Sequence, residues 1–364
     1  MLQQTVLNQA HREIGARMVD FGGWDMPLRY GSQVDEHNAV REGAGMFDVS
    51  HMTIIDLRGE QVRDFLKKLL ANNIDKLTLK GKALYSCMLN EQGGIIDDLI
   101  VYLMGDDKYR LVVNAGTREK DLAWIEKQAE AYAVEVLERR TLAMIAIQGP
   151  KAREITEGLL HRGLGARSSR LAPFQAAWAG DWFVARTGYT GEEGYEVIMP
   201  ESDAVFFWKS LAGKGVTPCG LAARDTLRLE AGMNLYGSDM DENFTPLESG
   251  LTWTVAFEPA ERDFIGRSAL LAQKEKGGIA KFVGLVLEDK GVLRNHQKIV
   301  VEGVGEGEIS SGGFSPTMNR SIALARVPAG TGEQCGVDIR GKLKAAAVVK
   351  PCFVRNGKIL VNLD

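Results

Sequence analysis

Two adjacent carboxylates are the first candidates for chemistry, because they lie inside an otherwise apolar stretch, residues 95–102. Successive residues of a strand point to opposite faces of a sheet, so Asp97 and Asp98 are expected on opposite sides. A buried carboxylate is unfavourable unless it accepts hydrogen bonds or meets a cation. One interpretation is a carboxylate that acts in an apolar site. The other is a strand-end aspartate that holds the Gly93-Gly94 turn, and the residues alone leave both open.

A second candidate is the glycine-rich segment from Thr187 to Val197. Glycine permits positive φ and close approach of the backbone. A phosphate-binding loop is disfavoured, because the lysine-bearing Walker pattern and Gly-x-Gly-x-x-Gly are both absent. A hairpin turn is the simpler interpretation, but it leaves Glu196 unexplained inside the returning apolar strand. A carboxylate at that position could accept paired N–H donors from a planar heterocycle.

A third candidate is the mostly apolar helix predicted over residues 220–232, which carries two arginines and two acids. Charged side chains that leave water need partners. Asp225 and Arg228 are three residues apart and can pair on the helix. Arg224 has no equally good acid close by on the helix, so the residues alone favour an interdomain salt bridge for it over a binding role.

Metal-dependent and thiol-dependent chemistry find little support, and no metal site is expected. The five histidines are scattered and no Cys-x-x-Cys occurs, so no cluster has the spacing of zinc ligands. Ser50 precedes His51, but no Gly-x-Ser-x-Gly pattern supports a nucleophile and base, and His51 is interpreted as a core-edge histidine. Reduced, partly buried thiols are expected at the four cysteines, Cys87, Cys219, Cys335 and Cys352.

The composition argues against two further classes of protein. The chain has 364 residues, with 44 basic and 48 acidic side chains, whereas a general nucleic-acid binder needs a basic excess. No apolar stretch reaches the length of a membrane span. Residues 1–15 lack the pattern of a signal or transit peptide, so a cytoplasmic protein is expected, with neither nucleic acid nor membrane as a partner. The length predicts two or three domains.

The elements that position the paired aspartates are predicted within residues 52–140. The apolar stripe of a surface helix occurs at residues 62–70. Thr117 is expected to cap a second helix, which ends near residue 131. This order, with one additional strand, resembles a ferredoxin-like unit, and its strands are predicted at 53–58, 83–89, 95–103, 109–114 and 134–137.

A similar order of elements follows. Gly149-Pro150 is expected to open a helix with proline in its first turn. A second helix is predicted at 203–211, and strands are predicted at 144–148, 182–186 and 195–199. Beyond about Lys281 the pattern changes to short apolar runs punctuated by glycine and proline, which indicates a small β-barrel or sandwich. These runs lie at 282–287, 322–327 and 345–349.

Seven segments, taken in order along the chain, resemble the aminomethyltransferase (T-protein) family of the glycine cleavage system. They are residues 18–24, 45–52, 93–102, 187–196, 220–232, 234–237 and 311–317. Related folate-binding proteins of iron–sulfur repair and tRNA maintenance carry a Lys-Gly-Cys-Tyr-x-Gly-Gln-Glu motif. The corresponding stretch here is Arg-Thr-Gly-Tyr-Thr-Gly-Glu at 186–192, which argues against the alternative of a non-enzymatic folate-binding protein.

The resemblance implies an α+β fold with three domains in a cloverleaf around a central folate channel. Ferredoxin-like units and a small C-terminal β-barrel are part of that expectation. Residues 1–51 with 142–245 would form the first folate-binding domain, and 52–141 an inserted ferredoxin-like domain. Residues 246–364 would form a linker and the barrel.

The resemblance also implies a reaction. The methylene of an aminomethyl group, carried on the dihydrolipoyl arm of H-protein, joins N5 and N10 of tetrahydrofolate, and ammonia leaves. Tetrahydrofolate is then a co-substrate, the lipoyl group belongs to the partner, and no metal is needed. The expected partners are lipoylated H-protein and the other glycine cleavage proteins. A folate-dependent partner in sarcosine or dimethylglycine demethylation is a third possibility, but it usually accompanies a flavin domain.

The resemblance gives the paired aspartates different roles. The family places the second aspartate of Gly-Gly-x-x-Asp-Asp beside the folate N10, and that residue is Asp98. Asp97, which faces the other way, is assigned to structure. A carboxylate suits a site where a cationic carbon develops, because a low dielectric strengthens their attraction.

The folate-binding residues follow from the same resemblance. Glu196 is expected to accept from the N–H edge of the pterin, and Arg224 to serve as a polar anchor. Tyr85 and Tyr189 are expected as pocket walls or hydrogen-bond partners, and Asn114 as a weaker candidate for a polar contact. Some family members bring a C-terminal tyrosine to the folate, but residues 352–358 offer none, so that contact stays unassigned.

Overall fold

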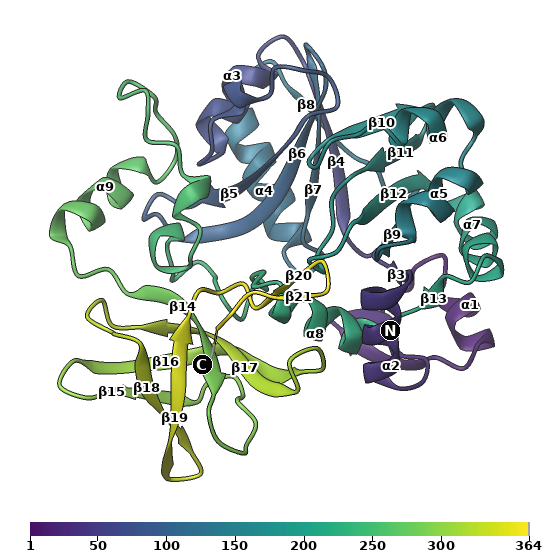
Figure 1. The fold of residues 1–364 in the computed structure, drawn as a ribbon. Helices are drawn as coiled ribbons and strands as arrows, with labels where there is room; N and C mark the ends of the chain where they lie inside the picture. The colour runs from purple at the N-terminus through teal and green to yellow at the C-terminus, as the bar shows by residue number, and fades with distance from the viewer. Residues whose placement is uncertain (363–364) are drawn as a thin grey trace. The chain divides into compact units, whose positions relative to one another are not determined.

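The computed structural model describes residues 1–362 (Figure 1). The chain divides into two compact units. The first unit comprises Met1–Val62, Lys76–Leu84 and Ile100–Leu227. The second comprises Arg63–Asp75, Tyr85–Leu99 and the chain from Arg228 onward. Among the described residues, no helix is long and apolar enough to cross a membrane.

A six-stranded sheet forms the centre of the first unit. Its order is β10-β11-β12-β9-β3-β13, antiparallel except for the pairing of β13 with β3. The strands are β3 (Gly45–Asp48), β9 (Leu142–Gln148), β10 (Ala176–Ala179), β11 (Trp182–Ala185), β12 (Gly194–Pro200) and β13 (Thr217–Pro218). Every residue of β9 is buried, which explains why this strand is a nearly continuous apolar run in the sequence.

Several helices come before and after β9 along the chain. They are α1 (Asn8–Glu13), α2 (Gln33–Glu42), α5 (Ala152–Leu159), α6 (Arg162–Ser168), α7 (Glu201–Gly213) and α8 (Leu221–Glu230), and a two-stranded sheet pairs β1 (Arg17–Phe21) with β2 (Trp24–Arg29). Ser32 caps α2, since its hydroxyl accepts from the backbone N–H of Asp35 at 3.3 Å. Ala204, Phe207, Trp208 and Leu211 of α7 are buried in the same core as β9 and β12.

The start of α5 differs from the prediction. The helix begins at Ala152 with Lys151 as N-cap, so the proline of Gly149-Pro150 lies outside its first turn. Gly149 has φ of +127°, and a Cβ there would approach the carbonyl oxygens of Gly43 and Val40 to 2.5 Å. The Gly-Pro pair therefore lies where two backbone segments pass close to each other, and the helix starts after it.

A five-stranded sheet of order β5-β6-β7-β4-β8 contains the paired aspartates. Its strands are β4 (Thr53–Arg58), β5 (Ala83–Leu89), β6 (Ile95–Gly105), β7 (Lys108–Val113) and β8 (Glu135–Glu138), with α3 (Val62–Leu69), a 3-10 turn η1 (Ile74–Lys76) and α4 (Arg118–Ala129) between them. This element order confirms the predicted ferredoxin-like order with one additional strand. Thr117, however, does not cap α4 through its side chain, because its hydroxyl donates to the carbonyl of Asn114 at 3.1 Å.

The second unit contains a closed barrel of order β14-β17-β16-β15-β18-β19. The strands are β14 (Lys281–Leu287), β15 (Lys298–Val301), β16 (Gly305–Ser315), β17 (Arg320–Val327), β18 (Gln334–Ile339) and β19 (Lys342–Val349). Before the barrel come η2 (Pro246–Glu248), η3 (Thr252–Thr254) and α9 (Arg267–Lys276), and after it β20 (Val354–Arg355) pairs with β21 (Lys358–Ile359). Leu285, Ile299, Ile309 and Val337 are fully buried in the barrel. The mixed α and β class and the C-terminal barrel are thus confirmed, and the choice between barrel and sandwich is decided for the barrel.

Candidate functional site

The paired aspartates lie near the start of β6, directly after a tight turn. Asn90 closes this turn, since its Oδ1 accepts from the N–H of Gly94 at 2.8 Å. A Cβ on Gly94 would lie 1.9 Å from the carbonyl oxygen of Glu242, so only glycine fits there. Asp97 is fully buried and Asp98 is half-buried, which is the difference in environment that the strand alternation predicts.

Tyr85 of β5 holds the carboxylate of Asp98. Its hydroxyl donates to Asp98 Oδ2 at 2.8 Å. The Tyr85 ring in turn stacks on Trp253 of η3, with ring centroids 5.5 Å apart and planes 20° apart. Trp253 is 63% exposed. The result is an oriented carboxylate beside an exposed aromatic surface, all within the second unit.

Glu196 is a buried acid on β12 in the first unit, with only 8% of its surface exposed. The hydroxyl of Thr187 donates to Glu196 Oε2 at 2.5 Å. Burial raises the pKa of Glu196, whereas the Thr187 hydrogen bond and the charge of Arg224 lower it. A carboxyl held this way favours any ligand whose N–H groups stabilise its ionised form.

Arg224 lies near the start of α8 and stacks on an aromatic ring. Its guanidinium carbon is 4.7 Å from the centroid of Tyr189. The Nη1 atom is buried and has no hydrogen-bond partner among residues 1–362, and no ion pair to Arg224 occurs there either. Burial lowers the pKa of Arg224, and Glu196 and Tyr189 oppose that shift. An unsatisfied buried guanidinium N–H is costly and is the kind of group that a ligand acceptor satisfies.

The remaining candidate, Asn114, directly follows β7, and its carbonyl accepts from Thr117. The structure therefore brings Tyr85 together with Asp98, and Arg224 with Tyr189 and Glu196, in two groups that belong to different units.

Two residues were missed by sequence reasoning. Thr187 was only a boundary of the glycine-rich segment, and nothing in the sequence links its hydroxyl to Glu196. Trp253 lies in a short 3-10 segment without apolar periodicity, so the only signal was a tryptophan between two threonines. Both matter because each contacts a residue that the sequence did single out.

His51 is a buried side chain close to the Arg224 group. Burial, together with the charge of Arg224, lowers the pKa of His51 to about 4, against an opposing effect of Asp48. Ser50 donates its hydroxyl to the carbonyl of Met144 at 3.1 Å, and His11 pairs with Asp48 at 3.0 Å. The structure thus forms no Ser50–His51 pair, in agreement with the interpretation of His51 as a core-edge histidine.

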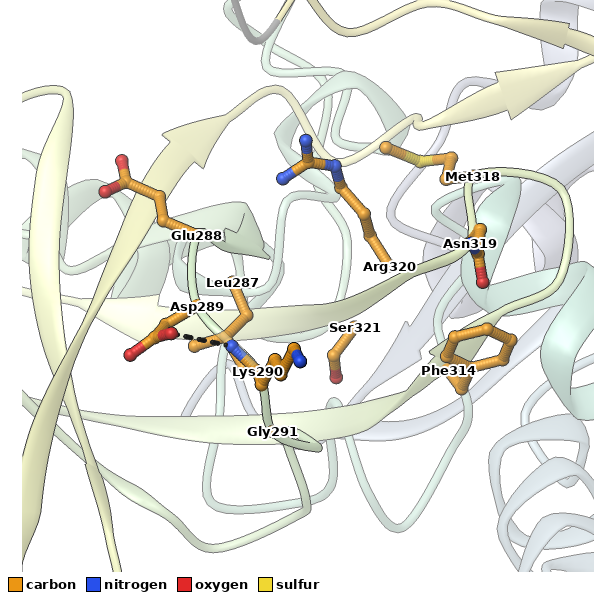
Figure 2. Close-up of a pocket in the computed structure, with 10 residues that line it drawn as sticks. All are labelled: Leu287, Glu288, Asp289, Lys290, Gly291, Phe314, Met318, Asn319, Arg320 and Ser321. Atoms are coloured by element: carbon orange, nitrogen blue, oxygen red, sulfur yellow. Dashed lines mark hydrogen bonds between the residues drawn. The ribbon is translucent and has the colours of Figure 1, made fainter.

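A hollow on the barrel does not involve the predicted residues. The hollow in Figure 2, about 550 Å³ in volume, lies on the barrel, and its lining includes the exposed Lys290 and Arg320. None of the predicted site residues lines it. Within residues 1–362, no three His, Cys, Asp or Glu side chains gather as a metal site, and burial raises the pKa of the thiols of Cys87, Cys219 and Cys335.

Comparison with known proteins identifies the family. The model for the GCVT N-terminal domain matches residues 7–259, and that for the glycine cleavage T-protein C-terminal barrel domain matches residues 281–355. The chain belongs to the glycine cleavage T-protein family.

Similar T-proteins match over nearly their whole length. A protein of Nitrosococcus oceani named aminomethyltransferase is 60% identical over 361 residues, covering 99% of this chain and 97% of that protein. One of Methylococcus capsulatus with the same name is 55% identical over 359 residues, covering 99% of both. The crystal structure of glycine cleavage system aminomethyltransferase T from Bartonella henselae superposes with a TM-score of 0.91 at 34% identity, covering 98% of this chain and 99% of that one. The predicted resemblance is therefore confirmed.

Proposed function

We propose that this T-protein transfers the methylene of aminomethyl-dihydrolipoyl H-protein to tetrahydrofolate, which gives 5,10-methylenetetrahydrofolate and ammonia. Family membership and full-length relatives named aminomethyltransferase support an enzyme of this kind. The observation that carries the proposal is the half-buried Asp98 carboxylate, held by the hydroxyl of Tyr85 at 2.8 Å. A protein that only stored folate would need no such oriented carboxylate.

The polar cluster of the first unit fits the recognition of a reduced pterin. The pterin edge offers adjacent N–H donors, and the buried carboxylate of Glu196 offers acceptors that are already oriented by Thr187. The buried Nη1 of Arg224, which has no protein partner among the described residues, would donate to an acceptor oxygen of the folate. Tyr189 keeps that guanidinium in place from one face.

The chemistry requires no group beyond these side chains and the two substrates. The bond from the methylene to the amino group and the C–S bond both break, and two C–N bonds form to N5 and N10. The two protons that leave N5 and N10 balance those taken up by the departing amine and by the sulfur. Positive charge develops on the transferred carbon before the second C–N bond forms. The proposed role of Asp98 is to stabilise this charge and to handle the proton that leaves the folate nitrogen.

Tyr85 would hold Asp98 in the orientation that this role needs. The hydrogen bond from Tyr85 to one carboxylate oxygen helps to orient the group without neutralising its charge. The stacked Trp253 restricts the Tyr85 ring from one side. Asn114 remains a proposed polar contact to the pterin.

Partners and setting are part of the same proposal. A lipoylated H-protein would bring the aminomethyl group. The other glycine cleavage proteins would load that group onto the lipoyl arm and reoxidise the dihydrolipoyl arm after the transfer. The cytoplasm stays the predicted compartment. The division into 1–51 with 142–245, 52–141 and 246–364 also stays a prediction.

The direct test is turnover of the purified chain with aminomethylated H-protein and tetrahydrofolate. Ammonia and 5,10-methylenetetrahydrofolate should form in equal amounts, and omission of either substrate should abolish both. Tight folate binding without ammonia release would contradict the proposal and would indicate a folate-binding protein instead.

A further inference from the structure

The glycine-rich turn that precedes β12 is organised around one buried side chain, Gln148. Gln148 is the last residue of β9 and is fully buried. Its Nε2 donates to the carbonyl of Thr187 at 3.2 Å and lies 3.4 Å from that of Tyr195, so it contacts both ends of the turn. Its Oε1 accepts from the hydroxyl of Thr190 at 2.9 Å. One amide thus ties the start, the middle and the end of the segment together.

Two glycines of the turn leave room for this amide. A Cβ on Gly188 would lie 1.9 Å from Gln148 Oε1, and a Cβ on Gly194 would lie 2.2 Å from the carbonyl oxygen of Ile147 and 2.6 Å from Gln148 Nε2. Neither glycine has a positive φ, whereas Gly191 between them does, at +77°. The glycine at 188 is therefore explained by space for Gln148, the glycine at 194 by the adjacent Ile147 carbonyl together with Gln148, and Gly191 by turn geometry.

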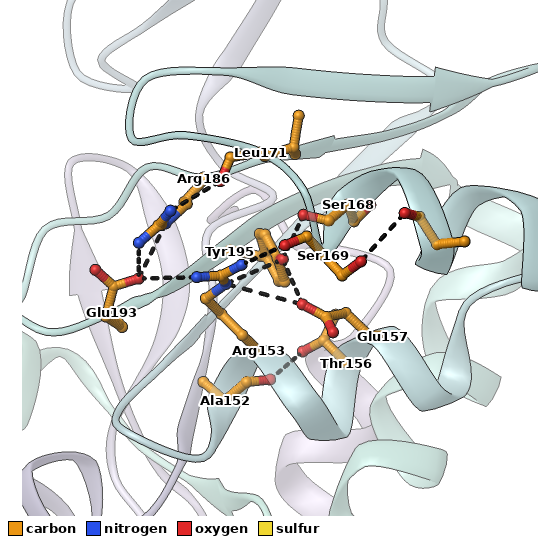
Figure 3. Close-up of polar contacts among 11 residues, drawn as sticks. Ala152, Arg153, Thr156, Glu157, Ser168, Ser169, Leu171, Arg186, Glu193 and Tyr195 are labelled. Carbon is orange, nitrogen blue, oxygen red and sulfur yellow. Dashed lines mark hydrogen bonds and ion pairs between the residues drawn. The ribbon is translucent and has the colours of Figure 1, made fainter.

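Charged side chains make further contacts at the same turn (Figure 3). Arg186 donates to Glu193 Oε2 at 2.7 Å and to the carbonyl of Leu171 at 2.8 Å. Arg153 lies 3.5 Å from the same Glu193 oxygen and donates to the hydroxyl of Tyr195 at 3.1 Å. These charged groups are partly exposed, so each contributes little to the stability of the turn. Gln148, in contrast, is fully buried.

The residues held by Gln148 adjoin those proposed to bind folate. Thr187, whose carbonyl accepts from Gln148, donates its hydroxyl to Glu196. Tyr189, between Gly188 and Thr190, lies against the guanidinium of Arg224. A shift of the turn would move both the donor to Glu196 and the ring beside Arg224.

We infer that Gln148 is a positioning residue of the folate-binding cluster, which acts through the Thr187–Gly194 turn and does not itself contact the substrate. This inference rests on the proposed function. The Gln148 amide sets the affinity for the pterin by fixing the Thr187 hydroxyl and the Tyr189 ring. A role in stability alone would leave folate affinity unchanged in any variant that still folds.

The test compares two isosteric losses of a buried hydroxyl. Thr190→Val removes the hydrogen bond to Gln148 and a longer one accepted from the N–H of Glu192 at 3.3 Å, while Thr156→Val removes one to the carbonyl of Ala152 in α5, at 2.7 Å. Both threonines are fully buried and lie in the same unit. Tetrahydrofolate binding by calorimetry and thermal melting without ligand would be measured for wild type and both variants. Thr190→Val should raise the Kd about fivefold through loss of the hydroxyl contacts that hold the turn, and Thr156→Val should leave it within about twofold.

A double-mutant cycle supplies the second measurement. Gly188→Ala should weaken folate binding because its methyl displaces the Gln148 amide. In a Gln148→Ala background the same methyl meets no amide, so its further effect on the Kd should be much smaller. The inference would be overturned if the wild type binds folate, Thr190→Val binds it with unchanged affinity, and the effects in the cycle are additive. The proposed function would still stand in that case. Absence of folate binding in the wild type would instead overturn the proposed function, and the inference with it.

Discussion

Replacement of Glu196 by glutamine should separate folate affinity from stability. In the folded chain, Thr187 already donates to one carboxylate oxygen of Glu196 at 2.5 Å. The single carbonyl oxygen of glutamine would remain with Thr187, so its NH₂ group would face the N–H edge of the pterin. One hydrogen bond to a charged acceptor is lost and two donors oppose each other, which costs about 2–3 kcal/mol of binding. The Kd for tetrahydrofolate should rise about 30- to 150-fold.

The same variant should not be less stable without ligand. Burial raises the pKa of Glu196 above its ordinary value of about 4.5, so the folded state binds a proton more tightly than the unfolded state. The stability that this group contributes is present below pH 4.5 and is lost as pH rises through the folded pKa. A rise in pH through that range therefore lowers the free energy of unfolding, and the neutral glutamine removes this pH-dependent cost.

The assay is calorimetric binding of tetrahydrofolate at pH 7 together with thermal melting of the free protein. The expected pair of results is a much higher Kd and a melting temperature equal to or above that of wild type. Wild-type affinity in Glu196→Gln would refute the pterin assignment. A large drop in melting temperature with unchanged affinity would show that Glu196 serves the fold alone.

The other predictions concern Tyr85 and Arg224. Tyr85→Phe removes the donor to Asp98, so steady-state kinetics should show kcat about tenfold lower. Calorimetry should show a Kd for tetrahydrofolate within about threefold of the wild-type value. An equal rise in Kd would indicate that Tyr85 instead forms a wall of the folate pocket. Arg224→Ala removes a buried charge that has no ion pair among the described residues, so folate binding should weaken about tenfold or more while melting of the free protein is not lowered. A variant with lower melting temperature and normal folate affinity would restore the salt-bridge interpretation of Arg224.

Much of the local structure could be predicted because it depends on short-range patterns. The strands at 53–58 and 83–89 begin and end where predicted, since alternation of side chains and turn residues define them locally. The hairpin that joins β5 and β6 was readable from residues 90–94, and it already implied that Tyr85 and Asp98 lie on adjacent strands. Helix starts were less predictable, because the Thr117 hydroxyl donates to the carbonyl of Asn114 and does not accept from the first N–H groups of the helix.

Long-range pairing was outside the reach of sequence patterns. Closure of the barrel depends on β14 pairing with both β17 and β19, and no local signal specifies the pairing with β19. Arg224 and Tyr189 are 35 positions apart, and their contact depends on a turn whose shape is set by Gln148. The chemical roles came from resemblance to the T-protein family, since the residues alone left Asp98 and Arg224 with structural alternatives.

The central claim is that Asp98 acts on the transferred carbon, and single-turnover kinetics of Asp98→Asn with saturating tetrahydrofolate tests it most directly. Asparagine keeps an acceptor for the Tyr85 hydroxyl but removes the negative charge. Ammonia release from aminomethylated H-protein should slow at least about 100-fold, while the Kd for tetrahydrofolate stays within about threefold. Ammonia release at the wild-type rate in this variant would contradict the claim and leave Asp98 with a structural role.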